Sequence, residues 1–173
     1  IAVLVLSLLY LKNFEEITLH EIVKEAYWHV TAAFLTIALT ILVIDHLNEK
    51  RKIQQEKRAL IQGLRSPIRS KVEHSLDSLR AENWVEDGTL SNVNLIGLDF
   101  ERLDFRNVNL KNSNLTRTIL TNANFEGGNF QNADLRACKA DRANFETARF
   151  TAAIMNDGKY SYCSFKNTNL ADL

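Results

Sequence analysis

Two cysteines and one histidine–glutamate pair are the residues of this sequence with the clearest capacity for chemistry. Cys138 and Cys163 lack the CxxC spacing and the neighbouring ligands that a metal site or a disulfide framework requires. We expect them to be two small, buried core residues. His20 and Glu21 match the start of an HExxH zinc motif, but Lys24 stands where the second histidine belongs, so the paired imidazoles are missing.

Other patterns of an active site are absent from the sequence. It contains no nucleophile beside a base, no carboxylate pair placed for a cleft and no glycine-rich phosphate loop. We therefore predict that the protein is not an enzyme. We also predict no catalytic, cofactor-binding or metal-binding residues, and no cofactor.

Composition divides the chain into three segments. Residues 1–45 are mostly apolar, residues 46–87 are charged with helical spacing, and residues 88–173 follow a period of five. We interpret them as a transmembrane helical hairpin, cytoplasmic linker and capping helices, and a repeat domain. The 21 basic and 21 acidic residues give a net charge of zero, which does not favour a strongly charged partner.

The longest uncharged stretch predicts a membrane span. Residues 27–44 form 18 residues without a formal charge, which as a helix would be about 27 Å long, close to the hydrocarbon thickness of a bilayer. Tyr27 and Trp28 mark one end, and a basic cluster at residues 50–52 follows the other. A buried helix of a soluble protein is the alternative, but it needs a larger surrounding protein than this chain supplies.

A second apolar stretch, Ile1–Leu11, is too short to span a bilayer, and we interpret it as the second half of a truncated helix. A cleaved signal peptide fits less well, because the basic n-region and the small-residue cleavage site are missing. Residues 46–85 hold nine Lys or Arg against five Asp or Glu, whereas the segment between the two apolar stretches is acidic. The positive-inside rule therefore predicts that the repeat domain lies on the cytoplasmic side.

Two helices are expected between the span and the repeats. Residues 46–62 continue the second span as a polar helix, and Ser66–Pro67 predicts the start of another, because serine caps exposed amides and proline fits the first helical position. The apolar face of this second helix consists of Ile68, Val72, Leu76 and Leu79. We predict that this face covers the N-terminal end of the repeat domain and that Trp84 and Val85 seal the first coil.

The C-terminal half places a large residue at every fifth position, here called the centre of each repeat. Fourteen of the seventeen centres are Leu or Phe, and the set is Leu90, Leu95, Phe100, Phe105, Leu110, Leu115, Leu120, Phe125, Phe130, Leu135, Ala140, Phe145, Phe150, Met155, Tyr160, Phe165 and Leu170. From Ser113 to Thr168 the residue two positions before each centre is small, and Asn or Asp usually stands between. A period of five matches neither a helix nor a strand, and it indicates a chain that turns a corner every five residues.

This pattern resembles the pentapeptide-repeat family, whose motif A(D/N)LXX is clearest in the stretches NANF, NADL and RANF. The resemblance covers about half of the chain. It implies an all-β, right-handed quadrilateral β-helix of about four coils, with the large and small residues of each repeat inside. The span, the sequence VIDHLNEKRK and the sequence NWVEDGTL before the repeats also resemble the arrangement of membrane-anchored bacterial members.

Four repeats per coil place every fourth repeat in one column, at the strand spacing of about 4.8 Å. This register predicts an inner ladder of Phe105, Phe125, Phe145 and Phe165 and an outer ladder of Asn92, Asn112 and Asn132. It aligns Arg106 with Glu126 and Glu146 with Lys166. It also places Cys138 and Cys163 in different columns, without a disulfide.

Two departures from the pattern carry structural expectations. The first coil has Val93, Leu98, Leu103 and Val108 where later coils have small residues, and we expect a wider coil that meets the capping helix. Ala140 is a small centre and is expected to loosen the packing locally. Four exposed arginines are candidates for anion binding, but we expect them on different columns among acidic residues, as solvated side chains: Arg102, Arg117, Arg136 and Arg142.

These expectations favour a non-catalytic, membrane-anchored scaffold or accessory subunit in a bacterial cytoplasmic (inner) membrane or a thylakoid membrane. It would present the repeat rod to a protein partner or a multi-subunit membrane complex. One alternative is an oligomeric membrane effector or pore, a homo-oligomer with Thr31, Thr36 and Thr40 in a helix contact. Another is mimicry of DNA toward gyrase, which some family members perform with an acidic rod. Nine acids against ten bases from Gly88 onward oppose it, and we expect no nucleic-acid partner.

Overall fold

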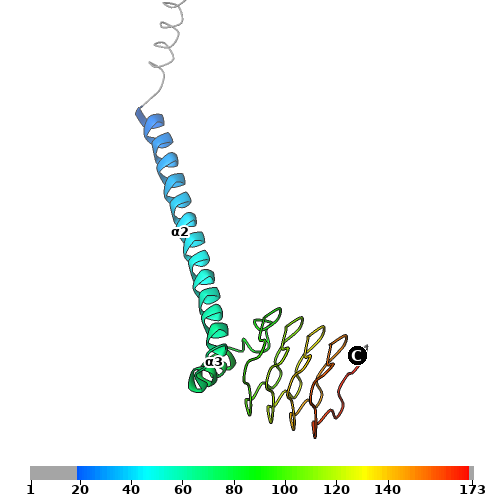
Figure 1. Cartoon of the computed structure of the whole chain (residues 1–173). Helices are drawn as coiled ribbons and strands as arrows, with labels where there is room; N and C mark the ends of the chain where they lie inside the picture. The colour runs from blue at the N-terminus through cyan, green and yellow to red at the C-terminus, as the bar shows by residue number, and fades with distance from the viewer. Residues whose placement is uncertain (1–18, 172–173) are drawn as a thin grey trace, which may run out of the picture. The chain divides into compact units, whose positions relative to one another are not determined.

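The computed structural model describes residues 19–171, and the predicted first helix of the hairpin lies outside them. Helix α2 (Leu19–Leu64) and helix α3 (Arg69–Ala81) precede the repeats (Figure 1). The chain divides into two compact units, Ile1–Lys52 and Ile53–Leu173. This boundary differs from the segment ends at 45 and 87, because the last turns of α2 pack with α3 and the repeats. The membrane and cytoplasmic assignments of those segments stay predictions.

In the first unit, α2 carries the uncharged stretch. It is the one helix within residues 19–171 that is long and apolar enough to cross a membrane, with a mean hydropathy of 2.0 in a window of which 0% is buried. Trp28, Phe34 and Leu42 are each about two-thirds exposed. Length and composition alone do not distinguish a span from other apolar helices, so the hairpin stays a prediction.

In the second unit, the repeats form a four-sided β-helix. Parallel bridges join residues one coil apart on four successive faces, for example Asn94 to Asn114, Asp99 to Ile119, Asp104 to Asn124 and Asn109 to Asn129. Each bridge is a pair of backbone hydrogen bonds: Leu95 N donates to Asn114 O at 2.7 Å, and Asn114 N donates to Val93 O at 2.9 Å. The observed register is the predicted one, and successive coils lie side by side (Figure 1).

The corners explain the preference for Asn and Asp. At most corners the amide three residues after a centre donates back to the carbonyl of that centre, as Ala123 N does to Leu120 O at 3.0 Å. The second corner residue, here Asn122, has a φ of 58°, a conformation that Asn tolerates better than most residues. Before the centre, Asn124 Oδ1 accepts the Glu126 amide at 3.1 Å and holds the next corner as an Asx turn.

The interior of the β-helix is filled by stacked rings. Phe105, Phe125, Phe145 and Phe165 form the predicted ladder, with centroid distances of 5.2, 5.4 and 5.3 Å between successive rings. Phe130 stacks on Phe150 at 4.7 Å in a neighbouring column. Small inner residues such as Ala123 and Ala143 leave room for these rings and are themselves buried. The predicted outer ladder is also present, since Asn112 Nδ2 donates to Asn92 Oδ1 and Asn132 Nδ2 to Asn112 Oδ1, each at 3.1 Å.

Ala140 does not leave the packing loose as expected. It is fully buried, and Tyr160, one coil further in the same column, reaches back so that its hydroxyl donates to Leu135 O at 3.0 Å. Gly158 permits this position of the ring, because a Cβ atom there would lie 2.3 Å from Tyr160 Cε2. A small centre and a glycine thus accommodate one large side chain between them.

The helices cover the first coil as predicted, with one correction. Val72, Leu76 and Leu79 of α3 and Leu64 of α2 are buried in the same apolar cluster as the repeat interior. Ile68, however, is 60% exposed, and α3 begins at Arg69 rather than at Ser66–Pro67. Ile68 has extended backbone angles and its amide donates to Ser66 Oγ at 3.2 Å, so serine orders the turn before the helix rather than capping it.

The large inner residues of the first coil take part in this contact. Leu103 and Val108 are buried, and Val93 and Leu98 pack at the margin of the cluster. Val85 is buried and Trp84 half-buried, and Asn109 N donates to Val85 O at 2.9 Å. Trp84 and Val85 therefore seal the first coil as predicted, and Val85 also extends the backbone ladder by one bond.

Three arginines complete the cap by donating to backbone carbonyls at the edge of the first coil. Arg65 Nε donates to Asn94 O at 3.1 Å, Arg69 Nη2 to Glu101 O at 2.5 Å, and Arg80 Nη2 to Asp104 O. One coil later, the equivalent carbonyls are those of Asn114, Thr121 and Asn124, and each accepts a backbone amide of the preceding coil. The guanidinium groups therefore occupy the place of a missing coil and satisfy an edge that would otherwise be unpaired.

Candidate functional site

The two cysteines serve as inner hydrogen-bond donors. Both are free thiols, and Cys138 is buried as expected, whereas Cys163 is only half-buried. Cys138 Sγ donates to Leu115 O at 2.9 Å and Cys163 Sγ to Ala140 O at 2.8 Å. Ser113 Oγ makes the equivalent bond to Leu90 O at 2.8 Å, so cysteine replaces serine in a packing role. Burial raises the pKa of Cys138 to about 12 and also raises the pKa of Cys163, which disfavours the reactive thiolate.

The histidine–glutamate pair lies near the start of α2, where His20 and Lys24 are exposed. Within the described residues, no three His, Cys, Asp or Glu side chains are grouped so that they could hold a metal ion. The sequence-based rejection of a zinc site therefore meets no contrary geometry in residues 19–171.

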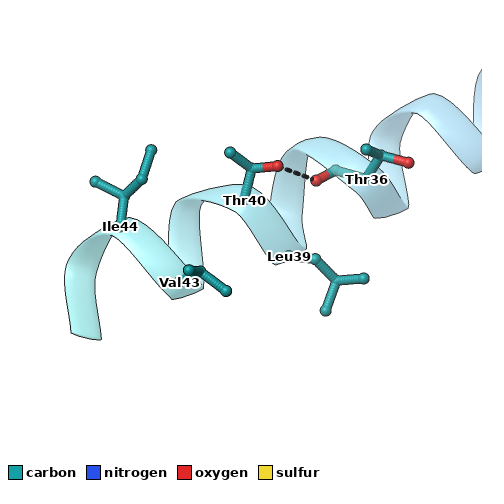
Figure 2. Close-up of a pocket in the computed structure, with 5 residues that line it drawn as sticks. All are labelled: Thr36, Leu39, Thr40, Val43 and Ile44. Carbon is teal, nitrogen blue, oxygen red and sulfur yellow. Dashed lines mark hydrogen bonds between the residues drawn. The ribbon is translucent and has the colours of Figure 1, made fainter. Parts of the chain in front are cut away.

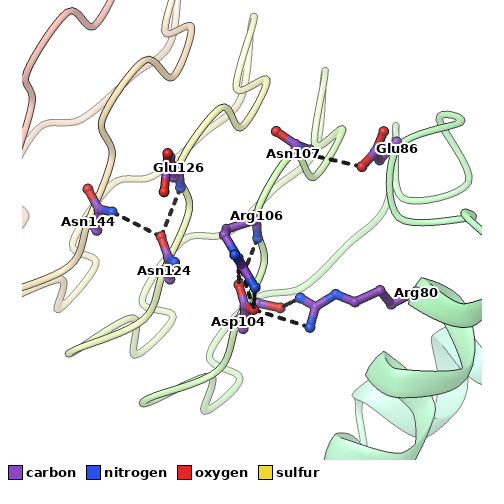
Figure 3. A network of polar contacts seen from close by, with 8 residues as sticks. All are labelled: Arg80, Glu86, Asp104, Arg106, Asn107, Asn124, Glu126 and Asn144. Carbon is purple, nitrogen blue, oxygen red and sulfur yellow. Dashed lines mark hydrogen bonds and ion pairs between the residues drawn. The ribbon is translucent and has the colours of Figure 1, made fainter.

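An ion-pair network lies where α3 meets the first coil (Figure 3). The Asp104 carboxylate contacts Arg106 Nη2 at 2.8 Å and Arg80 Nη1 at 3.3 Å. Burial alone would raise the pKa of Asp104, but hydrogen bonds from Arg106 and the positive charge of Arg80 outweigh it and lower this pKa below its ordinary value. The network therefore holds Asp104 ionised.

The alignment predicted along this corner of the coil holds, but the aligned side chains form their contacts with other partners. Arg106 bonds to Asp104, two residues earlier, rather than to the aligned Glu126. Glu146 accepts a hydrogen bond from Ser164 Oγ at 2.9 Å rather than pairing with Lys166. The local geometry wins because the Asx turn already holds the carboxylate beside the following corner residue. Arg136 and Asp134 repeat the arrangement at 2.6 Å.

A hollow of about 200 Å³ beside this network is lined by Arg80, Asn83, Val85, Glu86, Arg106 and Asn107. Its acidic and basic groups are already paired, because Asn107 Nδ2 donates to Glu86 Oε1 at 3.3 Å and both arginines contact Asp104 (Figure 3). It is smaller than the usual ligand pocket of about 300–1,000 Å³. We find in it neither a nucleophile with a base nor an unpaired anchor for a substrate.

The four candidate arginines are distributed differently from the expectation. Arg102 and Arg142 share one column, with Asn122 between them, because they are two coils apart. Arg117 and Arg136 lie on one corner of neighbouring coils, and Arg117 N donates to Arg136 O at 2.9 Å. Arg102 contacts Glu101 at 3.3 Å, and Arg136 contacts Asp134. Of the four, Arg117 and Arg142 form no ion pair within the described part of the chain.

On α2, two of the three predicted contact residues, Thr36 and Thr40, line a shallow groove of about 300 Å³ together with Leu39, Val43 and Ile44 (Figure 2). Thr36 Oγ1 donates to Ala32 O at 2.8 Å and Thr40 Oγ1 to Thr36 O at 2.7 Å. Thr31 Oγ1 bonds to Trp28 O in the same way at 3.0 Å. The hydroxyl donors are thus used within the helix, which leaves a surface of methyl groups rather than a polar lining.

Sequence reasoning missed the cap arginines and one further cation. Lys57 Nζ contacts Asp87 Oδ2 at 2.5 Å and lies 4.9 Å from the centre of the Trp84 ring. No repeat or spacing indicates these contacts, because they depend on how the end of α2 and α3 lie on the first coil. What the described geometry offers is a capped rod with flat, polar faces, which is suited to binding a protein surface rather than to enclosing a small substrate.

Comparisons with known proteins agree with the geometry of the repeats. The family model described as Pentapeptide repeats matches residues 89–127 and 129–170, in eight copies. A comparison of the chain with curated proteins finds no match.

Three solved structures illustrate the likeness. A pentapeptide repeat protein from the thylakoid lumen of Arabidopsis thaliana is 26% identical over 47% of this chain and 60% of its own, with a TM-score of 0.36. HetL, involved in heterocyst differentiation regulation in the cyanobacterium Nostoc sp. strain PCC 7120, is 24% identical over 46% of this chain and 39% of its own, with a TM-score of 0.26. QnrB1, a plasmid-mediated fluoroquinolone resistance protein, is 17% identical over 48% of this chain and 75% of its own, with a TM-score of 0.16.

The chain thus spans 60% and 39% of the length of the first two proteins, and TM-scores this low carry no argument about function. The period of five, the four-sided register and the family match nevertheless agree over the same residues. The C-terminal half of this chain is therefore a pentapeptide-repeat domain, a right-handed quadrilateral β-helix of a family whose members are generally non-catalytic structural and interaction proteins.

Proposed function

We propose that the protein is a membrane-anchored scaffold or accessory subunit that presents its repeat rod to a protein partner in a membrane complex. The exposure of the apolar stretch on α2 carries this proposal. Its most apolar window is 0% buried, and large side chains such as Trp28, Phe34 and Leu42 are exposed along it. An apolar surface of this extent in water would drive association, and a lipid bilayer is the environment that removes the cost.

The repeat domain supports the second part of the proposal. Its interior is filled by side chains, so the available binding surface is the outer faces. Such faces are flat and extended, as is usual for repeat domains that bind other proteins. In this proposal the repeats lie on the cytoplasmic side of a bacterial cytoplasmic (inner) or a thylakoid membrane, and the basic residues that follow the apolar stretch support that side.

Fractionation of bacterial cells that express the full chain tests the anchor. We expect the protein to stay in the membrane pellet after alkaline carbonate extraction, whereas a matched variant that lacks residues 1–45 is expected in the supernatant. Release of the full chain by carbonate would contradict the proposal. For the topology, a thiol at the exposed corner position Asn122, introduced as Asn122→Cys, should react with an impermeant maleimide only after the membrane is opened. Labelling of intact cells would place the repeats on the other side.

Two other functions are supported less well. An oligomeric effector or pore would need a polar lining, but the hydroxyls of Thr31, Thr36 and Thr40 are bonded to carbonyls of their own helix. Mimicry of DNA would need a negative rod, and the repeats carry nine acids against ten bases. Ion conductance in liposomes or strong inhibition of gyrase supercoiling would reverse this ranking.

A further inference from the structure

One face of the repeat domain departs from the local sequence pattern more often than each of the other three. The outward residue before each centre is Asn or Asp at most positions, because its side chain forms the Asx turn that holds the next corner. The face with the outward column Asp99, Ile119, Lys139 and Lys159, here called the lysine face, keeps this bond at Asp99 alone. Three successive coils therefore give up a local stabilising bond on this face.

The same face places two like charges opposite each other. Lys139 and Lys159 are partners in a parallel bridge, and both side chains are exposed. Residues in this relation lie about 4.8 Å apart, and like charges directly opposite on a sheet destabilise it. In residues 19–171 neither ammonium group forms an ion pair. The fold itself does not require this pair, since Asn occupies equivalent positions on other faces.

The corner beside the two lysines carries a cation and an exposed ring. Arg142 and Tyr162 are neighbours in one column, with φ values of 60° and 59°. Asn or Gly occupies half of the sixteen such corner positions between Asn92 and Asn167, and Tyr162 is the single aromatic residue among them. This conformation is costly for a bulky side chain, and the ring is nevertheless 88% exposed. Departures from local rules of this kind concentrate at functional sites.

We propose that Lys139, Lys159, Arg142 and Tyr162 form a docking patch for an acidic segment of a partner protein, an inference that rests on the proposed scaffold function. The three cations match two or three carboxylates along an extended or helical segment. Tyr162 supplies the rigid aromatic contact that protein interfaces favour. A phosphate polymer fits less well, because its continuous line of charge needs a longer basic surface than three cations with Asp141 and Asp157 on the bordering corners.

Charge reversal on the lysine face, with an equal reversal on other faces as control, tests the patch in the full chain in detergent micelles. The probe is a fluorescein-labelled peptide of repeated Glu-Glu-Leu, and the readout is fluorescence anisotropy. We expect the pair Lys139→Glu and Lys159→Glu to weaken binding at least about tenfold, because it reverses two opposed charges within the contact. The pair Arg149→Glu and Lys166→Glu changes the net charge equally and should weaken binding less than about twofold.

Three results would overturn the patch. They are absence of peptide binding, equal weakening by both pairs, and tighter binding of oligo-dT or of phosphatidylserine vesicles than of the peptide at the same face. Tyr162→Ala should weaken binding about fivefold, and an unchanged affinity would remove the ring from the patch and contradict its composition.

Photocrosslinking in the native membrane separates failure of the patch from failure of the scaffold function. A benzophenone side chain is placed at position 162 or, as control, at Asn169 on the opposite face. A crosslink from 162 to an acidic segment of a membrane-complex subunit supports the patch. A partner captured only from 169 overturns the patch and leaves the scaffold function standing, whereas no protein crosslink from either position contradicts both.

Discussion

The first coil and the later coils of the repeat domain satisfy equivalent carbonyl groups with different donors. The carbonyls of Asn114 and Asn124 accept backbone amides of the preceding coil. Their counterparts in the first coil, Asn94 and Asp104, accept the guanidinium groups of Arg65 and Arg80. The difference teaches that a solenoid edge can be ended by helix side chains that imitate a coil, without any continuation of the repeat sequence.

The interior of the first coil also differs from that of the later coils. Later coils combine a large ring with a small neighbour, such as Phe125 with Ala123. In the first coil, larger residues such as Leu103 replace the small ones and join the cluster that includes Leu76 and Leu79 of α3. One region is therefore stabilised by stacking along the axis and the other by contact with a helix, and the two can be perturbed separately.

Removal of a ring from the ladder is expected to have the largest effect. Phe125→Ala leaves a cavity between Phe105 and Phe145 and should lower the free energy of unfolding by about 3–5 kcal/mol. Leu98→Ala in the first coil removes a half-buried side chain and should cost less than about 2 kcal/mol. Urea unfolding of the full chain in detergent, followed by circular dichroism, measures both. Equal losses would show that the ladder is no more important than the cap contact.

Loss of a cap arginine comes next in size. Arg80→Met leaves the Asp104 carbonyl without this donor and should cost about 1–3 kcal/mol. The matched change in a later coil, Arg136→Met, removes an exposed ion pair with Asp134 that solvent screens, and it should cost clearly less than Arg80→Met. The same unfolding measurement compares them. A cost for Arg136→Met as large as that for Arg80→Met would contradict the edge-capping role.

The smallest effect is expected in the pH dependence of stability at the two ion-pair sites, Asp104 and Asp134. The pKa of Asp104 and that of Asp134 are both lowered on folding, so each ionised carboxylate adds stability above its ordinary pKa of about 4 and loses it as the pH falls further. The melting-temperature difference between the wild type and Asp104→Asn should therefore shrink below about pH 4. Asp134→Asn should behave likewise with a smaller difference, because one guanidinium rather than two contacts Asp134. A difference that grows on acidification would reverse the sign of this linkage.

The sequence alone was sufficient to predict the rod, because its information is periodic. One register aligns Phe105 with Phe125 and Asn92 with Asn112, and the same spacing of 20 residues recurs in the later coils. The register does not fix which group a side chain contacts, because a nearer partner can compete with the aligned one. Arg106 contacts Asp104 rather than Glu126, and an Asx turn places that carboxylate closer.

The cap and the docking patch were less accessible to sequence reasoning. Burial of Val72 and exposure of Ile68 depend on where α3 begins, and an ordered turn at Ser66 delays that start. The contacts of Arg65 and Arg69 depend on how the helices lie over the coil, which no spacing encodes. The column that Arg102 and Arg142 share does follow from the period of the repeat. An arginine by itself, however, does not mark a binding surface.

The four-sided register has a consequence for how such a rod can change in length. Bridges join residues one coil apart. Deletion of residues 115–134, which is one full coil, would therefore shorten the rod by one coil and leave each remaining residue on its own face. Loss of a single repeat would keep the internal pattern equally well, yet it would turn every subsequent side through a quarter revolution. Insertion or deletion of one repeat can thus change the direction in which the later coils present their outer side chains, while the hydrophobic core stays continuous.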